Sequence, residues 1–516
     1  MRNRYLYITL LALLGITPES MAQAKIQYAP RLVVSITIDQ LRTDYIEAFA
    51  PLYGDDGFKR LLQQGLVFNN ASYPFTPIDR ASAVASVATG CTPYYHSIVG
   101  EHWLNRETLR TVYCLGEELT AGELLTSTIG DELKVATEGN TKVYSISPFE
   151  DAAILAAGHA ANGAFWIDDV YGRWRSATYF MAQQPEWLPV YNYMSSPAKE
   201  DGKYTWDPII ELSGSFNYFQ HTANNQKPFK HKFSGANRFN QLKTSGLING
   251  FVTDMAQQLV NKETLGFDRV TDFLAVNYYA GTFGHRPMSE CQMELQDTYV
   301  RLDRELARLI TGIEKRLGTE HVLFVVTSTG YSDIESADYA KYHIPTGTFY
   351  MNRTANLLNM FFGAIWGQGR YVESCFQNQM FLNHRLLESK RISLTDACQR
   401  AQEFLAQVSG VRNVYSGLQL LTNINEQTRK VRNGYNAERC GDILIEVSPG
   451  WRLYNEDNQD TQQSRASFVQ FPIIFYGANI EANKVSSQVT TDRIAPTIAK
   501  SIRIRAPNAC SAEPLF

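Results

Sequence analysis

Residues 33–45 read VVSITIDQLRTDY, and this stretch decides the fold. It continues an apolar, β-branched run that starts at Arg31 and ends at the carboxylate of Asp39. Such runs are typical of a strand buried on both faces of a parallel sheet. Three similar runs, at 272–276 (DFLAV), 321–327 (HVLFVVT) and 470–476 (QFPIIFY), predict further core strands.

Segments between these strands have the spacing of helices. Residues 57–65 (GFKRLLQQG) predict a short amphipathic helix closed by glycine, and 79–88 predict a helix capped by Asp79. Residues 290–315 place Leu302, Leu306 and Leu309 on one helical face, which we interpret as core-facing. Strands that alternate with helices predict an α/β protein, an α/β/α sandwich around a mostly parallel sheet.

Two long stretches interrupt this alternation. Residues 162–267 are rich in Tyr, Trp, Phe, Asn, Ser and Gly and predict an inserted cap. Residues 341–426 predict a second insertion, with helices near 357–362 and 394–408. We therefore expect one core with insertions, spanning residues 25–516.

The N-terminus has the pattern of an export signal. Arg2 and Arg4 precede an apolar stretch of about a dozen residues, followed by small residues that allow cleavage after Ala22 or Ala24. The expected signal peptide is residues 1–24, and no later segment reaches the roughly 18 apolar residues that a membrane span needs. We expect an exported protein without a transmembrane segment, in the periplasm or associated with the outer membrane of a Gram-negative bacterium.

Composition and cysteine content exclude some classes of function. The net charge of −4, without a run of like charges, gives no electrostatic footprint for nucleic acid or an anionic membrane surface. The seven cysteines lack CxxC spacing, so a zinc site built from them is not expected. An oxidising compartment permits disulfides, but an odd count leaves at least one thiol unpaired, and the pairing cannot be read from the sequence.

Several segments in order resemble the alkaline phosphatase superfamily, near its phosphate-irrepressible monoesterases and its type I phosphodiesterases and nucleotide pyrophosphatases. They include residues 33–45, 53–73, 88–103 (ATGCTPYYHSIVGEHW), 145–166, 272–285 (DFLAVNYYAGTFGH) and 491–500 (TDRIAPTIAK). The resemblance covers roughly residues 30–510. It implies an alkaline-phosphatase-like fold in which two zinc ions about 4 Å apart activate a Ser or Thr nucleophile at a helix N-terminus.

Followed residue by residue, the resemblance shows that most of this chemistry has been replaced. Of the six Asp and His positions that bind zinc in the family, Asp39 and His285 remain, and the other positions are Gly281, Ser328, Thr329 and Gln470. The nucleophile position is Arg80, and the positions of the Asn, Lys and Arg that hold phosphate are Glu101, Phe149 and Asp151. Together with Asp79, these residues form a vestigial pocket in which we expect no catalytic residue and no bound metal.

Some of these residues have more than one interpretation. Asp79 is one residue before the nucleophile position, but we favour a helix N-cap. Arg80 binds either an anionic ligand or, as we favour, neighbouring carboxylates such as Asp39, Asp79 or Asp151. We interpret His285 as structural, and we expect His96, His102 and His159 to pack or bond locally.

The leading hypothesis is an exported pseudophosphatase of the cell envelope that binds a protein or a glycan-like ligand and needs no cofactor. The alternative is a metal-dependent phosphoric or sulfuric ester hydrolase with an altered mechanism, which would use Asp79 or a single metal such as zinc. A third possibility is a structural subunit of a larger envelope assembly.

Overall fold

The computed structural model describes residues 28–209, 228–333, 342–422, 425–456, 460–462 and 469–516. The expected signal peptide and part of the expected cap, residues 210–227, lie outside the described residues.

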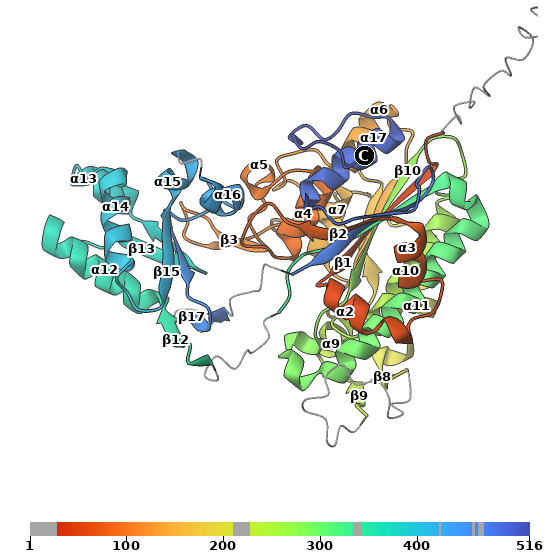
Figure 1. Ribbon diagram of the computed structural model, residues 1–516, viewed down its shortest axis with the longest axis horizontal. Helices are drawn as coiled ribbons and strands as arrows, with labels where there is room; N and C mark the ends of the chain where they lie inside the picture. Colours follow the sequence, from red (N-terminus) through yellow and green to blue (C-terminus); the bar gives the residue numbers. More distant parts are fainter. Residues whose placement is uncertain (1–27, 210–227, 334–341, 423–424, 457–459, 463–468) are drawn as a thin grey trace, which may run out of the picture.

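A central sheet organises the core, and its strand order is β20-β2-β19-β11-β1-β10-β5-β6-β7 (Figure 1). β1 (Leu32–Asp39) lies between β10 (Asp272–Tyr279) and β11 (Val322–Ser328), parallel to both. β5 (Val143–Ile146) and β6 (Gly163–Ile167) continue the parallel part beyond β10. β19 (Phe471–Gly477) and β2 (Leu66–Ser72) follow β11 in antiparallel pairings. The sheet is therefore mostly parallel, as predicted.

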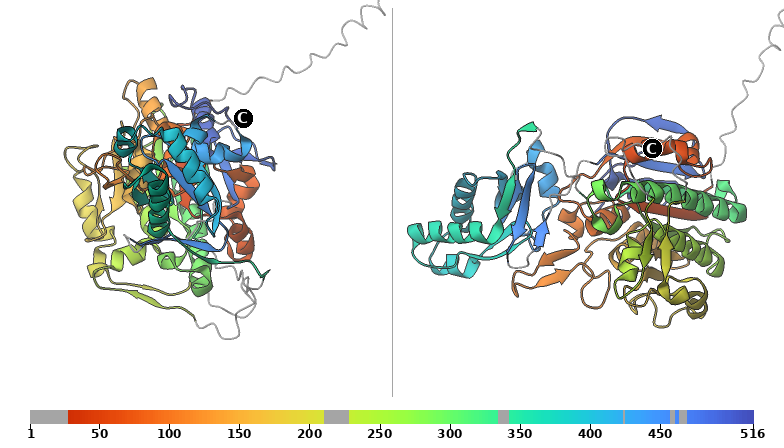
Figure 2. Two further views of the ribbon diagram at one scale, coloured as in Figure 1. Left: turned by 90° about the vertical axis from the view of Figure 1, so that its left-hand side faces the viewer. Right: turned by 90° about the horizontal axis from the view of Figure 1, so that it is seen from below.

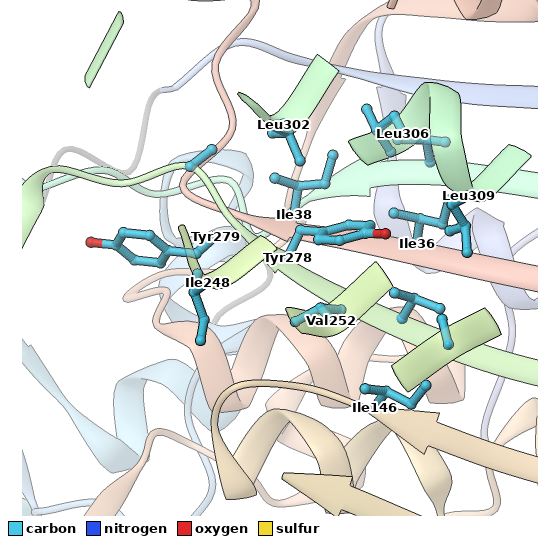
Figure 3. Packing of buried hydrophobic residues seen from close by; sticks show 14 of the residues in the cluster. Ile36, Ile38, Ile146, Ile248, Val252, Tyr278, Tyr279, Leu302, Leu306 and Leu309 are labelled. Carbon is cyan, nitrogen blue, oxygen red and sulfur yellow. The ribbon is translucent and has the colours of Figure 1, made fainter. Parts of the chain in front are cut away.

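Helices cover both faces of this sheet. Leu32, Val34, Ile36 and Ile38 of β1 face α10 (Ile248–Lys262) and α11 (Gln292–Leu317). Figure 3 shows Ile36 and Ile38 among side chains of these two helices. Val33 belongs to the cluster on the other face, with α4 (Arg80–Thr89), α7 (Glu150–Ala157) and α17 (Ile494–Ile502). Because successive side chains of a strand point to opposite faces, one buried strand packs against a layer of helices on each side of the sheet. The α/β/α prediction is confirmed.

Shorter elements complete the core. They are α2 (Thr43–Ala48), α3 (Phe58–Gln64), α5 (Pro93–His96), β3 (His102–Leu104), β4 (Thr111–Tyr113), α6 (Ile129–Ala136), β7 (Trp174–Arg175), β20 (Asn483–Val485) and β21 (Val489–Thr490).

The expected cap, residues 162–267, includes three core elements. β6 pairs with β5 and all five of its residues are buried, β7 continues the sheet beyond β6, and α10 packs against the sheet. What lies outside the sandwich is the stretch between β7 and α10, with α8 (Trp187–Ser195), β8 (Tyr204–Trp206), β9 (His231–Phe233) and α9 (Arg238–Lys243). β6 was not predicted, because the aromatic residues of this region were interpreted as part of a cap. Phe165 and Trp166 of β6 are instead buried in the core.

A second lobe has a sheet and a hydrophobic core of its own, separate from the main sheet (Figure 2). Its sheet has the order β13-β14-β16-β15. It runs past residue 426, because β16 pairs with β14 and β15. Its elements are β12 (Gly347–Tyr350), α12 (Met351–Trp366), β13 (Val372–Phe376), β14 (Gln379–Leu382), α13 (His384–Ser389), α14 (Leu394–Leu405), β15 (Val411–Ser416), α15 (Gly417–Thr422), α16 (Glu426–Asn433), β16 (Ile443–Val447), β17 (Trp451–Asn455) and β18 (Asp460–Gln462).

Two negative findings concern the described residues. None of the seven cysteines, all of which lie in the described ranges, forms a disulfide. Among the helices of the described ranges, none is long and apolar enough to cross a membrane.

Candidate functional site

The predicted pocket residues converge where several core elements end or begin. Asp39 ends β1, Ser328 ends β11, and the segment with Gly281 and His285 follows β10. Arg80 is the first residue of α4, and Phe149 precedes α7. Since the strands are parallel, their carboxyl ends meet at one edge of the sheet, where α/β proteins bind ligands.

Arg80 occupies the centre of this pocket. Its Nε donates to both carboxylate oxygens of Asp151, at 3.0 and 2.9 Å, and its Nη1 lies 3.8 Å from Oδ2 of Asp39. Its guanidinium lies over the ring of Phe149, 3.8 Å from the centroid. Burial lowers the pKa of Arg80, but Asp151 and then Asp39 raise it, and the net shift is well above the usual value. The preferred interpretation of Arg80, a partner of buried carboxylates, matches this geometry.

Asp39 is 3% exposed and is only partly satisfied by its neighbours. Its Oδ1 accepts from the hydroxyl of Thr329 at 2.9 Å, whereas Oδ2 accepts no hydrogen bond. Burial raises the pKa of Asp39, and the opposing effect of Arg80 and the hydrogen bond from Thr329 does not cancel this rise. Asp39 is therefore a buried carboxyl beside the cation of Arg80 and the hydroxyl of Thr329.

Asp79 is a helix cap. Its Oδ1 accepts from the backbone N–H of Ser82 at 2.9 Å, and Ser82 in turn accepts from the N–H of Asp79 at 3.0 Å, so the two form a capping box. Oδ2 accepts from the N–H of Glu101 at 2.6 Å. Both oxygens are occupied by local hydrogen bonds, which agrees with the N-cap interpretation.

Tyr279 and Gln40 fill the space beside Gly281. A Cβ at Gly281 would lie 2.6 Å from the hydroxyl oxygen of Tyr279 and 2.9 Å from Cδ of Gln40. The Tyr279 hydroxyl donates to the carbonyl of Thr282 at 2.7 Å. An aspartate therefore does not fit at Gly281 without displacing buried groups.

Ser328 and Thr329 are bound into the end of the sheet. Ser328 donates to the carbonyl of Leu41 at 2.7 Å and accepts from the N–H of Gly330 at 3.1 Å. Thr329 accepts from the N–H of Gln40 at 2.9 Å. Gly330 has a φ of 70°, and a Cβ there would lie 2.5 Å from the ring of Tyr73. These hydroxyls serve local structure at positions that bind zinc in the family.

His285 and Gln470 lie at the margin of the pocket. His285 is about half exposed, and its Nδ1 lies 3.0 Å from Oδ2 of Asp333. The same carboxylate oxygen accepts from the side-chain amide of Gln40 at 3.0 Å. Gln470 is exposed, and its carbonyl accepts from the N–H of Thr43.

The three other histidines bond locally, as expected. Buried His96 bonds Ser86 at 2.8 Å and accepts from the N–H of Ile98, and burial lowers its pKa to about 3. His102 packs on the ring of Tyr113, and His159 bonds Asp131.

Sequence reasoning missed four residues of this pocket: Lys243, Tyr279, Gln40 and Asp333. Lys243 comes from α9, is 5% exposed, pairs with Asp169 and lies 5.7 Å from the ring centroid of Phe149. Burial lowers the pKa of Lys243, although Asp169 raises it in part. Tyr279 and Gln40 stand next to predicted pocket residues in the sequence, but nothing local marks their role. Lys243 and Asp333 reach the pocket through contacts between separate segments, which a single sequence does not show.

The residues present do not fit a pair of zinc ions. Arg80 places a cation between the two buried carboxylates, where it would repel a divalent ion. A catalytic zinc site normally has three protein ligands. Within the described part of the chain, no group of three or more His, Cys, Asp or Glu side chains is arranged to hold a metal.

The fold and the place of this site define an alkaline-phosphatase-like protein. The family described as "Type I phosphodiesterase / nucleotide pyrophosphatase" matches residues 33–468. The chain therefore belongs to the type I phosphodiesterase / nucleotide pyrophosphatase family.

Two alkaline phosphatases are similar to the chain over most of its length. PhoV of Synechococcus elongatus is 28% identical, over 93% of this chain and 91% of its own length. PafA of Elizabethkingia meningoseptica is 28% identical, over 94% of both chains. The crystal structure of wild-type PafA superposes with a TM-score of 0.79 at 26% identity, covering 94% of this chain and 98% of that chain. Murine ectonucleotide pyrophosphatase / phosphodiesterase 5, at 10% identity and a TM-score of 0.51, shares the fold.

Proposed function

We propose that this chain is an exported pseudophosphatase, which keeps the alkaline phosphatase fold without the two-zinc phosphoryl-transfer reaction. One observation carries the proposal: the guanidinium of Arg80 stands at the first residue of α4, paired with Asp151 and facing Asp39. In the family that the sequence resembles, the residue at this position is the nucleophile. A guanidinium remains protonated in proteins and cannot attack phosphorus.

The charge pattern of the pocket supports the proposal. Phosphate dianions are bound by cations and N–H donors, whereas Glu101 and Asp151 are anionic at positions where the family holds phosphate. Arg80 is neutralised by Asp151, and Lys243 by Asp169. Both cations therefore already have a carboxylate partner and are not available to bind a phosphoryl group.

The pocket and the cap region are better suited to binding than to hydrolysis. In the region between β6 and α10, Tyr171 and Tyr193 are 67% and 86% exposed. Exposed aromatic side chains supply large contact areas for a protein or a sugar ring. We propose a cell-envelope ligand of one of these kinds, with no cofactor required.

Elemental analysis of the purified protein is the decisive experiment. The proposal predicts substoichiometric zinc after purification in zinc-containing buffer, and no chelator-sensitive hydrolysis of an aryl phosphate. Zinc near two equivalents together with robust chelator-sensitive hydrolysis would refute it. A purified alkaline phosphatase taken through the same steps is the positive control.

The second candidate is a metal-dependent phosphoric or sulfuric ester hydrolase of altered mechanism. It is favoured by one observation, the buried Oδ2 of Asp39, which accepts no hydrogen bond. Gln40, the residue after Asp39, donates to the carboxylate of Asp333, which lies 3.0 Å from Nδ1 of His285. This candidate predicts a chelator-sensitive esterase activity that both Asp39→Ala and His285→Ala abolish and that Ser501→Ala on α17 leaves intact. Inactivity against a broad panel of esters would exclude it.

A further inference from the structure

The outer helix of the second lobe, α12 (Met351–Trp366), carries large apolar side chains on its solvent side as well as on its buried side. Met351, Ala355, Leu358 and Phe362 are buried in the core of the lobe. Of the sixteen residues in α12, Arg353 alone is charged. A surface helix normally exposes a polar face, yet the exposed side of α12, at the edge of the lobe and away from the main sheet (Figure 1), combines Arg353 and Asn356 with large apolar side chains.

The solvent side of α12 carries an exposed apolar stripe. Leu357 is 51% exposed, Met360 72% and Ile365 40%. Leu357 and Met360 are three residues apart and neighbour each other, and Ile365 lies two turns after Leu357, further around the exposed side. Gly363, between them, has open space around the position of a Cβ. These residues, Leu357, Met360 and Ile365, are called the α12 stripe below.

Cations gather at the C-terminal end of the α12 stripe. The Nζ of Lys390 donates to the carbonyls of Trp366 and Gln368 at 3.0 and 2.9 Å, which fixes its charge beside the helix end. Arg370 is exposed four residues after the helix. Within the described residues neither Lys390 nor Arg370 forms an ion pair, so both charges are uncompensated.

Aromatic residues mark both ends of the helix, each with a cation beside it. The guanidinium of Arg353 lies 4.3 Å from the ring centroid of Tyr350, and that of Arg400 lies 5.8 Å from that of Trp366. Trp and Tyr favour the boundary between lipid headgroups and acyl chains. Apolar side chains between two aromatics, with uncompensated cations at one end, match the surface of an anionic bilayer in both hydrophobicity and charge.

We propose that α12 binds the surface of a phospholipid membrane with anionic headgroups, its stripe buried at the headgroup boundary. The helix lies on the membrane, since sixteen residues are too few to span it. The whole-chain net charge of −4 gives no sign of this, because it does not tell where the cations lie: the fold brings Lys390 to the end of α12, which Arg370 follows in the sequence. The proposal does not depend on the activity of the pocket.

Vesicle co-sedimentation tests the proposal with the full mature chain. It predicts binding to vesicles of phosphatidylglycerol and phosphatidylcholine, weaker binding to phosphatidylcholine alone, and partial loss of binding at high salt. Leu357→Asp with Met360→Asp should weaken binding roughly tenfold or more. Val190→Asp with Met194→Asp is the matched control, because those side chains are each 60% exposed on α8.

Two further measurements keep the outcome unambiguous. Thermal unfolding shows that the variants fold, and Arg370→Glu should reduce binding to anionic vesicles without altering the apolar stripe. Absence of binding by the wild type, or equal binding by the α12 variant and the wild type, would overturn the proposal. A dimer in light scattering that the α12 variant converts to monomer, without vesicle binding, would overturn it in favour of self-association.

Discussion

Arg80 and Asp151 form a buried ion pair in which one donor, Nε, lies 3.0 and 2.9 Å from the two carboxylate oxygens. The side chain of Arg80 is 15% exposed and that of Asp151 is 1% exposed. The pair joins the first turns of α4 and α7, which pack on the same face of the sheet. The pair therefore places an internal cation, compensated by carboxylates, at the start of both helices.

Removing that cation should be strongly destabilising. Arg80→Ala leaves Asp39 and Asp151 buried without a counter-charge, and breaking a buried pair in this way typically costs about 3–5 kcal/mol. Urea unfolding measures the loss. Arg175→Ala, which breaks the more exposed pair with Asp168, should cost about 1 kcal/mol or less.

Guanidinium should partly rescue the Arg80→Ala variant. The substitution creates a cavity lined by two carboxylates and the ring of Phe149, which suits a planar cation. At low millimolar guanidinium the unfolding temperature of Arg80→Ala should rise, whereas that of the wild type should not. An equal response of both proteins would show that no such cavity forms.

The glycine at position 281 should not tolerate even a methyl group. In Gly281→Ala the new Cβ would meet the Tyr279 hydroxyl at 2.6 Å, and overpacking of this kind typically costs about 1–3 kcal/mol. Gly363→Ala, on the open side of α12, should instead stabilise the protein by about 0.5–1 kcal/mol. Denaturant midpoints of the two variants, moving in opposite directions, would confirm that Gly281 is sterically required. Unchanged stability of Gly281→Ala would show that Tyr279 moves away readily.

The core strands could be predicted from the sequence because burial on both faces leaves a direct signature. The runs that form β1, β10 and β11 are continuous and apolar, and the structure buries every residue of each. β5 and β6 were missed, because four or five residues give too short a run to distinguish from a loop.

Within the site, local chemistry was predictable and long-range contacts were not. Asp79 precedes a helix and caps it, which sequence position alone indicates. The partner of Arg80 had three candidates, and only the fold shows that Asp151 is the close one. Lys243 and Asp333 come from separate segments of the chain, and nothing local marks them as neighbours of Phe149 and His285.

The buried carboxyl of Asp39 should make stability depend on pH. Its pKa is raised above the ordinary 3.8 by burial, so the folded state binds its proton more tightly than the unfolded state does. Its contribution to stability therefore becomes less favourable as pH rises from about 4 through the folded pKa. Asp39→Asn should be as stable as the wild type or more stable at pH 8, and the difference should shrink toward pH 4. If Asp39→Asn instead lost much stability at pH 8, and zinc stabilised the wild type but not the variant, Asp39 would be a metal ligand.

His159 should stabilise the protein more at low pH than at high pH. Its Nδ1 lies 3.0 Å from Oδ2 of Asp131 and its Nε2 lies 2.8 Å from the carbonyl oxygen of Leu124, so both nitrogens face acceptors. Two acceptors require two N–H donors, which only the imidazolium has. The hydrogen bond to Asp131 raises the pKa of His159 above 6.5, although burial opposes this rise.

The stabilising effect of His159 is complete below about pH 6.5 and is lost as pH rises through its folded pKa, because the folded state then gives up the proton it had bound more tightly. His159→Gln should therefore lower the unfolding temperature more at pH 5.5 than at pH 9. His321→Gln, next to the exposed Glu320, is the matched control and should show little difference between the two pH values. If His159→Gln lowers the unfolding temperature equally at both pH values, the ring stabilises the fold by packing and not by its charge.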